Sequence, residues 1–249
     1  MQQTNRSRHR HITSFQVISL GFLSAILLGS LLLMLPIATK SGQCTSFLDA
    51  LFTATSAVCV TGLVVNDTAT YWSLFGQGVI LLLIQIGGMG IITIAIAIAV
   101  VSGRKIGLMQ RSTMQEAISA PTVGGIVRRS QIILRTTILI EIIGAVLLAP
   151  VFCRDFGFWK GIWYSLFHSI SAFCNAGFDL IGIRTPFSSL TSYSVQPIVN
   201  LVIMMLIIAG GIGFLTWEDI KNRKWHFKKY RMQSKVILML TGILIFLPA

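Results

Sequence analysis

Apolar stretches long enough to cross a lipid bilayer recur along this chain and limit its fold more than any other feature. Four lie at residues 17–35, 78–101, 132–152 and 195–217, and a fifth begins at residue 236. Crossing the hydrocarbon core takes about 20 helical residues, whose backbone polar groups are then paired within the helix. A hydrophobic content of 54% with 11% charged residues could not cover a water-soluble globule with polar surface. We expect an all-α integral membrane protein that has the lipid bilayer as its surroundings.

Basic residues gather in the segments between the apolar stretches. Most of the 20 Lys and Arg residues lie within residues 1–16, 104–130 and 218–235. Loops rich in Lys and Arg stay on the cytoplasmic side of a membrane. We therefore expect a multi-pass protein of the cell membrane with a cytoplasmic N-terminus. The basic residues that produce the formal charge of +12 therefore indicate the membrane topology by their placement, and we expect no nucleic-acid partner.

Two shorter helices are predicted between the long ones, at residues 46–56 and 158–171. Eleven helical residues span only about 16 Å, roughly half of the hydrocarbon thickness. Each short helix is followed by an irregular stretch, at residues 57–62 and 172–177. Non-helical backbone at membrane depth is tolerated only against protein or water. We expect each helix and its loop to enter the membrane and return to the same side.

The chain contains an internal repeat. Residues 51–62 match residues 166–177 at an offset of 115, with six of the twelve positions identical. The long helices that follow share the pattern Gly-Gly-x-Gly-x-x-Thr, at residues 87–93 and 210–216. Such glycines usually allow membrane helices to pack closely, and flexible gating points are the alternative. This self-similarity predicts an array of like units, none of which buries its polar loop alone.

We therefore expect tandem parallel repeats of a helix, a re-entrant pore helix with a filter loop, and a second helix, as in K⁺ channels. The predicted segments are a cytoplasmic N-terminus (1–16), a first repeat (17–103), a cytoplasmic linker (104–130), a second repeat (131–217), a basic cytoplasmic linker (218–235) and the first helix of a truncated third repeat (236–249). Two units alone would expose polar loops to lipid. We expect the N-terminal part of a longer protein, the alternative being a short chain that closes a ring with other chains.

The two loops carry the chemistry that a cation needs. A cation leaves water when fixed oxygens replace its hydration shell, and backbone carbonyls supply such oxygens without a charge. Turning successive carbonyls to one side requires backbone angles that disfavour a Cβ, which predicts a structural role for Gly62 and Gly177. An ordinary turn is the simpler explanation for one glycine. Two glycines in matching positions after half-length helices favour an ion-binding loop.

The sequences at residues 55–63 and 171–178, TSAVCVTGL and SAFCNAGF, resemble the filter segments of the Ktr/Trk/HKT superfamily of potassium transporters. The resemblance is greatest to the bacterial Ktr membrane subunit. It implies K⁺ uptake without a cofactor, four units around one pore, a homodimer, and a cytoplasmic nucleotide-binding (RCK-type) regulatory subunit. It implies that the ion meets the carbonyls of Cys59, Val60, Thr61, Gly62, Cys174, Asn175, Ala176 and Gly177.

Several polar residues in or near the predicted membrane region are further candidates. An ionisable group inside a membrane span is a functional candidate by default. For Glu141 the two alternatives are a structural hydrogen bond and a role in coupling. Gln85 and His168 are read first as hydrogen-bonded scaffold residues. The acidic side chains expected outside are Asp49, Asp67, Asp155 and Asp179, and they either attract cations or are simply solvated.

Two other functions were weighed. A membrane enzyme would need paired carboxylates, a His cluster or an activated nucleophile, and the four His at positions 9, 11, 168 and 226 are scattered. We expect no enzymatic activity. A secondary transporter of another monovalent cation or a small solute is the alternative to the channel-like pathway, and Na⁺ dependence is left open. The basic segment 218–235 would contact anionic lipid or dock a regulator.

Overall fold

The structure, a computed structural model, describes residues 13–90, 126–183, 185–223 and 226–247. The described residues hold no β-strand, only one isolated bridge between Thr39 and Trp72, so the predicted all-helical fold is confirmed. In chain order the helices are α1 (Ser14–Met34), η1 (Pro36–Ala38), α2 (Phe47–Val58), α3 (Thr68–Tyr71), α4 (Leu74–Met89), α7 (Ile126–Phe156), α8 (Phe158–Phe173), η2 (Ser189–Tyr193), α9 (Pro197–Gly211), α10 (Phe214–Arg223), η3 (Phe227–Lys229) and α11 (Met232–Phe246). The predicted N-terminal segment and first linker lie largely outside the described residues.

Side chains at the helix starts explain where the first elements begin. Thr13 caps α1 in a capping box, because its side chain accepts a hydrogen bond from Gln16 N and the Gln16 side chain accepts one from Thr13 N. Ser46 caps α2, and its Oγ accepts from Asp49 N at 3.2 Å. The half-length helix predicted at residues 46–56 is α2, with 12 residues.

The second short helix turns back sharply from the helix before it. Helix α7 passes through Pro150 and continues beyond the predicted limit at residue 152, as far as Phe156. Gly157 has a φ of +81°, and α8 begins at the next residue. Gly161 then lies so close to the backbone of Cys153 that a Cβ would overlap it. This contact brings α7 and α8 together along their length.

Glycines interrupt the second long helix of each predicted repeat, which corrects the continuous spans expected at residues 78–101 and 195–217. Helix α4 ends at Met89, because Gly90 has a φ of +78°. Helices α9 and α10 meet at a 95° bend next to Gly213, whose φ is +80°. The last glycine of the repeated Gly-Gly-x-Gly pattern is therefore left-handed in both copies, at the end of α4 and between α9 and α10.

The described residues contain fewer uninterrupted membrane-length helices than the sequence predicted. In the described part of the chain, Phe15–Met34 and Gln131–Phe156 are long and apolar enough to cross a membrane. The bent pair Pro197–Gly211 and Phe214–Ile220 would be a third crossing if it counts as one span. Helix α4 is apolar but shorter, and the residues after Gly90 are outside the described part.

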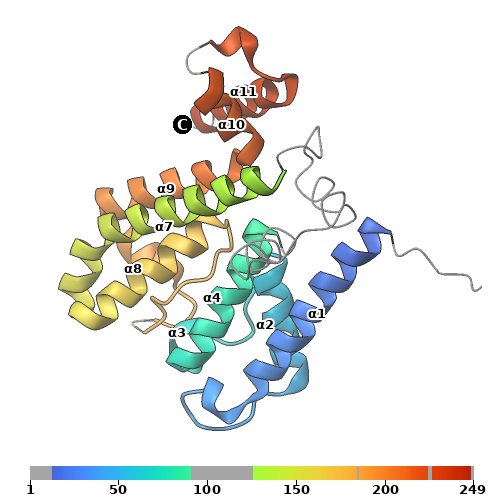
Figure 1. Ribbon diagram of the computed structural model, residues 1–249. Coiled ribbons are helices and arrows are strands. Elements are labelled where there is room, and N and C mark those ends of the chain that lie inside the picture. Colours follow the sequence, from blue (N-terminus) through green and yellow to red (C-terminus); the bar gives the residue numbers. More distant parts are fainter. Residues whose placement is uncertain (1–12, 91–125, 184, 224–225, 248–249) are drawn as a thin grey trace, which may run out of the picture.

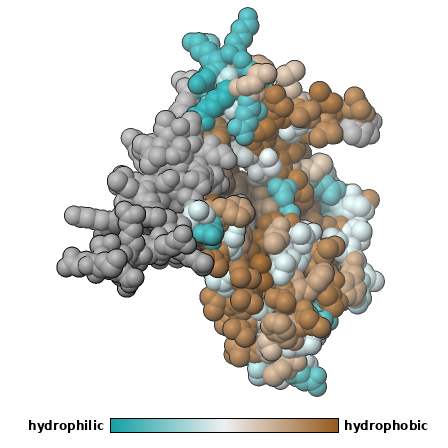
Figure 2. Space-filling model, turned by 90° about the vertical axis from the view of Figure 1, so that its right-hand side faces the viewer, coloured by the Kyte–Doolittle hydropathy of each residue, from teal (hydrophilic) through white to brown (hydrophobic). Residues whose placement is uncertain are grey.

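The outer faces of the helices are apolar. Large hydrophobic side chains stand exposed on α1, α4, α7 and α8, among them Phe15, Leu28, Leu82, Val146 and Trp159. Figure 2 shows one such face, brown over most of its described surface. Exposed apolar surface of this extent is typical of helices that face lipid or other membrane helices. Composition, helices and surface agree that this is a membrane protein.

The helices form two groups that meet at α4 and α8 (Figure 1). Helices α1, α2 and α4 pack together in the first group, and α7, α8 and α9 in the second. Trp163 on α8 donates a hydrogen bond of 2.9 Å from its indole N–H to Gln77 Oε1 on α4. Gln77 in turn donates to Trp72 O at 3.2 Å. The buried side-chain amide of Gln77 thus joins the two groups.

Ion pairs hold the last two long elements as a hairpin, which stands at the top of Figure 1. The Asp219 carboxylate accepts a 2.7 Å hydrogen bond from Ser234 and lies 3.6 Å from Arg231 and 3.7 Å from Arg223. Arg231 also contacts Glu218 at 3.1 Å. Part of the predicted basic segment is therefore neutralised within the protein.

Candidate functional site

Two loops follow the short helices and have the same hydrogen-bond pattern. Loop A (residues 59–62) follows α2, and loop B (residues 174–177) follows α8. In each loop three successive backbone N–H groups donate to carbonyls of the last helical turn. The bonds are Cys59 N to Thr55 O (2.8 Å), Val60 N to Ala57 O (3.3 Å), Thr61 N to Ser56 O (2.9 Å), Cys174 N to Ile170 O (2.9 Å), Asn175 N to Ala172 O (3.0 Å) and Ala176 N to Ser171 O (2.8 Å). Each bond of loop A has a counterpart in loop B whose donor and acceptor both lie 115 positions later.

The backbone conformation of the loops alternates between left-handed and ordinary residues. Val60 and Asn175 both have a φ of 58°, and Gly62 and Gly177 have φ values of +75° and +73°. Left-handed φ is tolerated by Asn and is rare for a β-branched residue such as Val. The matching values indicate that position within the loop, and not residue type, sets this conformation.

The hydrogen bonds determine which way the loop carbonyls face. In a trans peptide the C=O points opposite to the N–H of the next residue. Since the N–H groups of Val60 and Thr61 point back to α2, the carbonyls of Cys59 and Val60 point away from it. The same argument applies to Cys174 and Asn175 in loop B. Each loop therefore presents oxygens on the side opposite to its helix.

Loops A and B lie against each other at their glycines. A Cβ added to Gly62 would lie 2.6 Å from Ala176 O and 3.3 Å from the Gly177 Cα. A Cβ on Gly177 would lie 3.5 Å from the Gly62 Cα. The structure thus brings together two segments that are 115 positions apart in sequence, and it leaves no room for a side chain at Gly62.

Polar side chains fix each loop to its surroundings. Thr61 Oγ1 donates to Ser56 Oγ at 2.9 Å, and Ser171 Oγ donates to Phe178 O at 2.6 Å. His168 is buried, with Nδ1 2.7 Å from Tyr164 O, and its Nε2 accepts from Leu180 N at 3.3 Å. This arrangement agrees with the scaffold role expected for His168.

The glycine patterns hold the loops against the second helices. A Cβ on Gly87 would overlap Val58 O, and a Cβ on Gly210 would overlap Phe173 O. Both oxygens belong to the last residue of a short helix. The close packing expected for these glycines is therefore found at Gly87 and Gly210, whereas Gly90 and Gly213 end helices instead.

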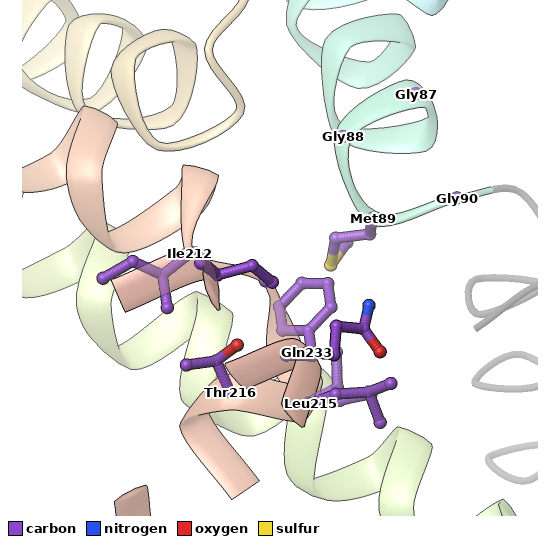
Figure 3. Close-up of a pocket in the computed structure, with 12 residues that line it drawn as sticks. Gly87, Gly88, Met89, Gly90, Ile212, Leu215, Thr216 and Gln233 are labelled. Atoms are coloured by element: carbon purple, nitrogen blue, oxygen red, sulfur yellow. The ribbon is translucent and has the colours of Figure 1, made fainter. Parts of the chain in front are cut away.

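A pocket of about 370 Å³ lies between the two glycine patterns. Figure 3 shows the end of α4, with Met89 and Gly90, facing Ile212, Leu215 and Thr216 across this space. Gln233 from α11 also lines it. The end of α4 and the bend between α9 and α10 thus open onto a common space.

Glu141 and Gln85 form a buried polar contact behind loop B. Gln85 Nε2 donates to both carboxylate oxygens of Glu141, at 3.0 and 2.9 Å. Cys174 Sγ donates to Gln85 Oε1 at 3.6 Å. The sequence identified Glu141 and Gln85 separately and gave no sign that they meet.

The acidic side chains expected at an outer mouth have different environments. Asp67 is buried, and its carboxylate accepts hydrogen bonds from Thr70 N and Phe187 N, each at 2.8 Å. Simple solvation, one of the two roles predicted for Asp67, does not fit this buried position. Asp179 lies beside loop B, and the pKa of its carboxyl is raised above the ordinary value. Burial is the main cause; the hydrogen bond from Ile181 N lowers this pKa in part, and the Asp67 carboxylate raises it further. Tyr193 donates to Asp155 at 2.8 Å.

Asp67→Asn is expected to lower the free energy of unfolding by about 1–3 kcal/mol, because an amide nitrogen would face the buried N–H of Phe187 or Thr70. Thermal unfolding in detergent measures the change. Asp49→Asn is the control, since Asp49 is more accessible and lies in the first turn of α2. Equal unfolding temperatures for both variants would contradict a bridging role for Asp67.

Comparison with known proteins identifies the family of this chain. The sequence profile of the TrkH family, described as cation transport proteins, matches residues 2–241. The chain belongs to the TrkH family. The resemblance inferred from the two loop sequences is therefore confirmed, and the family consists of transporters and not of enzymes.

Three relatives of this TrkH-family chain have informative names. It is 43% identical over 237 residues to the potassium/sodium uptake protein NtpJ of Enterococcus hirae, covering 95% of this chain and 51% of the relative. It is 47% identical over 230 residues to the Ktr system potassium uptake protein B of Bacillus subtilis, with 92% and 49% covered. For the Vibrio alginolyticus protein of that name, identity is 36% over 232 residues, with 92% and 49% covered. The chain thus spans about half the length of these relatives.

Proposed function

We propose that this chain contributes to K⁺ uptake across the cell membrane through a channel-like pathway lined by backbone carbonyls. The ion would contact carbonyl oxygens of loops A and B, residues 59–62 and 174–177, in place of water. One observation carries the proposal: two loops 115 positions apart share their hydrogen bonds and φ values and meet at Gly62 and Gly177. The names of the relatives support K⁺ as the ion.

The proposal includes the repeat architecture. Helices α1, α2 and α4 would form one unit, and α7, α8 and α9 another, with α2 and α8 as pore helices. The C-terminal ends of α2 and α8 carry partial negative charge beside the loops, which favours a cation there. Four such units would surround one pathway, with the N-terminus in the cytoplasm as the basic segments indicate.

Partners follow from the same proposal. Three relatives are named as proteins of a Ktr system. We propose a homodimer that binds a cytoplasmic nucleotide-binding regulatory subunit, with Na⁺ promoting uptake. The exposed Lys228 and Lys229 of the hairpin are available to such a subunit or to anionic lipid.

K⁺ uptake is tested in a bacterium that lacks its own uptake systems. The intact transporter containing this chain is expected to restore growth at limiting K⁺ and to raise cellular K⁺, measured by flame photometry. Excess Na⁺ should not replace K⁺ in the uptake assay. A protein that reaches the membrane, as shown by immunoblot, without any gain of K⁺ would overturn the proposal.

A further inference from the structure

The buried contact between α4, α7 and loop B is a chain of three side chains from three elements. Cys174, at the end of α8, donates to Gln85 on α4, and Gln85 donates to Glu141 on α7. Gly88 allows this approach, since a Cβ there would overlap Cys174. The Glu141 carboxylate is thus one side-chain amide away from the first residue of loop B.

An ionised Glu141 would need a counter-charge. Glu141 is only 4% exposed, and it lies in the middle of a helix that is long and apolar enough to cross the membrane. No Lys, Arg or His in the described residues forms an ion pair with it, and the side chain that donates hydrogen bonds to its carboxylate is the neutral Gln85. A buried carboxylate is normally paired with a cation. Loop B presents carbonyl oxygens on the side opposite to α8 and is the nearby place where a cation would sit.

The fold itself does not require this carboxylate. At the offset of 115 the first unit has Ile26 in the place of Glu141, and at the offset of 123 Ile208 takes the place of Gln85. The register is the same in both units, because Gly29 contacts Leu83 and Gly144 contacts Leu206 at those offsets. The polar chain therefore occurs beside loop B and has no counterpart at the matching positions.

We propose that Glu141 is a positioning residue for the transported cation, which serves as its counter-charge at loop B. The carboxylate favours a cation at the carbonyls of Cys174 and Asn175. Gln85 holds the carboxylate in place by donating to it, and its side-chain oxygen accepts a hydrogen bond from Cys174. This inference rests on the proposed K⁺ uptake. It makes loop B contribute more than loop A to holding the cation in the shared pathway, although the two backbones match.

Glu141→Gln and Glu141→Asp separate charge from shape. Glu141→Gln keeps the length and a hydrogen-bond acceptor for Gln85 but removes the charge. We expect it to raise the K⁺ concentration for half-maximal uptake about tenfold with a smaller effect on the maximal rate. Glu141→Asp keeps the charge one methylene farther away, and we expect about a threefold rise. Thr137→Val is the control, one turn earlier on α7, where the buried hydroxyl has no partner.

Uptake by the intact transporter is combined with K⁺ titration of its thermal unfolding in detergent, normalised to folded protein. Weaker stabilisation of Glu141→Gln by K⁺ would support the inference. A purely structural Glu141 would give the opposite order, with Glu141→Gln like wild type and Glu141→Asp impaired, and would overturn it. A wild-type protein that takes up no K⁺ would instead overturn the proposed function.

Discussion

Gly62→Ser is expected to remove most discrimination between K⁺ and Na⁺. The new Cβ would lie 2.6 Å from the backbone oxygen of Ala176 and 3.3 Å from the Gly177 Cα, and the φ of +75° disfavours any L side chain. Neither neighbour is a flexible side chain, so the two loops must move apart. Because carbonyl spacing sets the match to a dehydrated ion, we expect the K⁺/Na⁺ uptake ratio to fall by about tenfold or more.

The matched control is Gly42→Ser. Gly42 has a similar φ of +71°, but no heavy atom lies within 4 Å of its Cβ position. Gly177→Ser should be intermediate, because its φ is +73° and its nearest contact is 3.5 Å away. Isotope uptake in the presence of each ion gives the ratio. An unchanged ratio in Gly62→Ser would contradict a carbonyl-lined pathway through loop A.

Gly210→Ala is expected to lower the free energy of unfolding by about 3 kcal/mol, an effect of overpacking. Its Cβ would overlap Phe173 O at the end of α8, which would push α9 away from loop B. Thermal unfolding of the purified protein in detergent measures the change.

Gly78→Ala provides the comparison. Gly78 also lies within an apolar helix, α4, but no heavy atom lies within 4 Å of its Cβ position. There alanine should raise the free energy of unfolding by up to about 1 kcal/mol through helix propensity. Equal unfolding temperatures for the two variants would contradict the claim that close contact with Phe173 O requires a glycine at position 210.

Local patterns were enough to predict the short helices and the loops. Ser46 before an apolar run and the repeated Ser-Ala-x-Cys segment located α2, α8 and both glycines in the loops. Lengths and caps are properties of neighbouring residues, and the structure agrees with them within a few positions. The repeat boundaries and the ion-binding role of the loop residues remain predictions.

Features that depend on distant contacts were not predictable. A Gly-Gly-x-Gly segment fits both a packed helix and a broken one, so the interruptions at Gly90 and Gly213 could not be inferred. Val60 in a left-handed conformation contradicts residue preference and follows from the hydrogen bonds of its loop. Asp67 looked like a solvated loop residue, because its partner Phe187 is 120 positions away.

The glycines near the ends of α4 and α9 have two different roles, and the two roles fall at different positions. Gly87 and Gly210 fasten each second helix to the end of a short helix, and the left-handed residues Gly90 and Gly213 come three positions later. A rotation about Gly213 would swing α10 and leave the oxygens of the loops where they are. The contacts that place the loops and the residue at which the helix direction changes are therefore three positions apart and can vary independently.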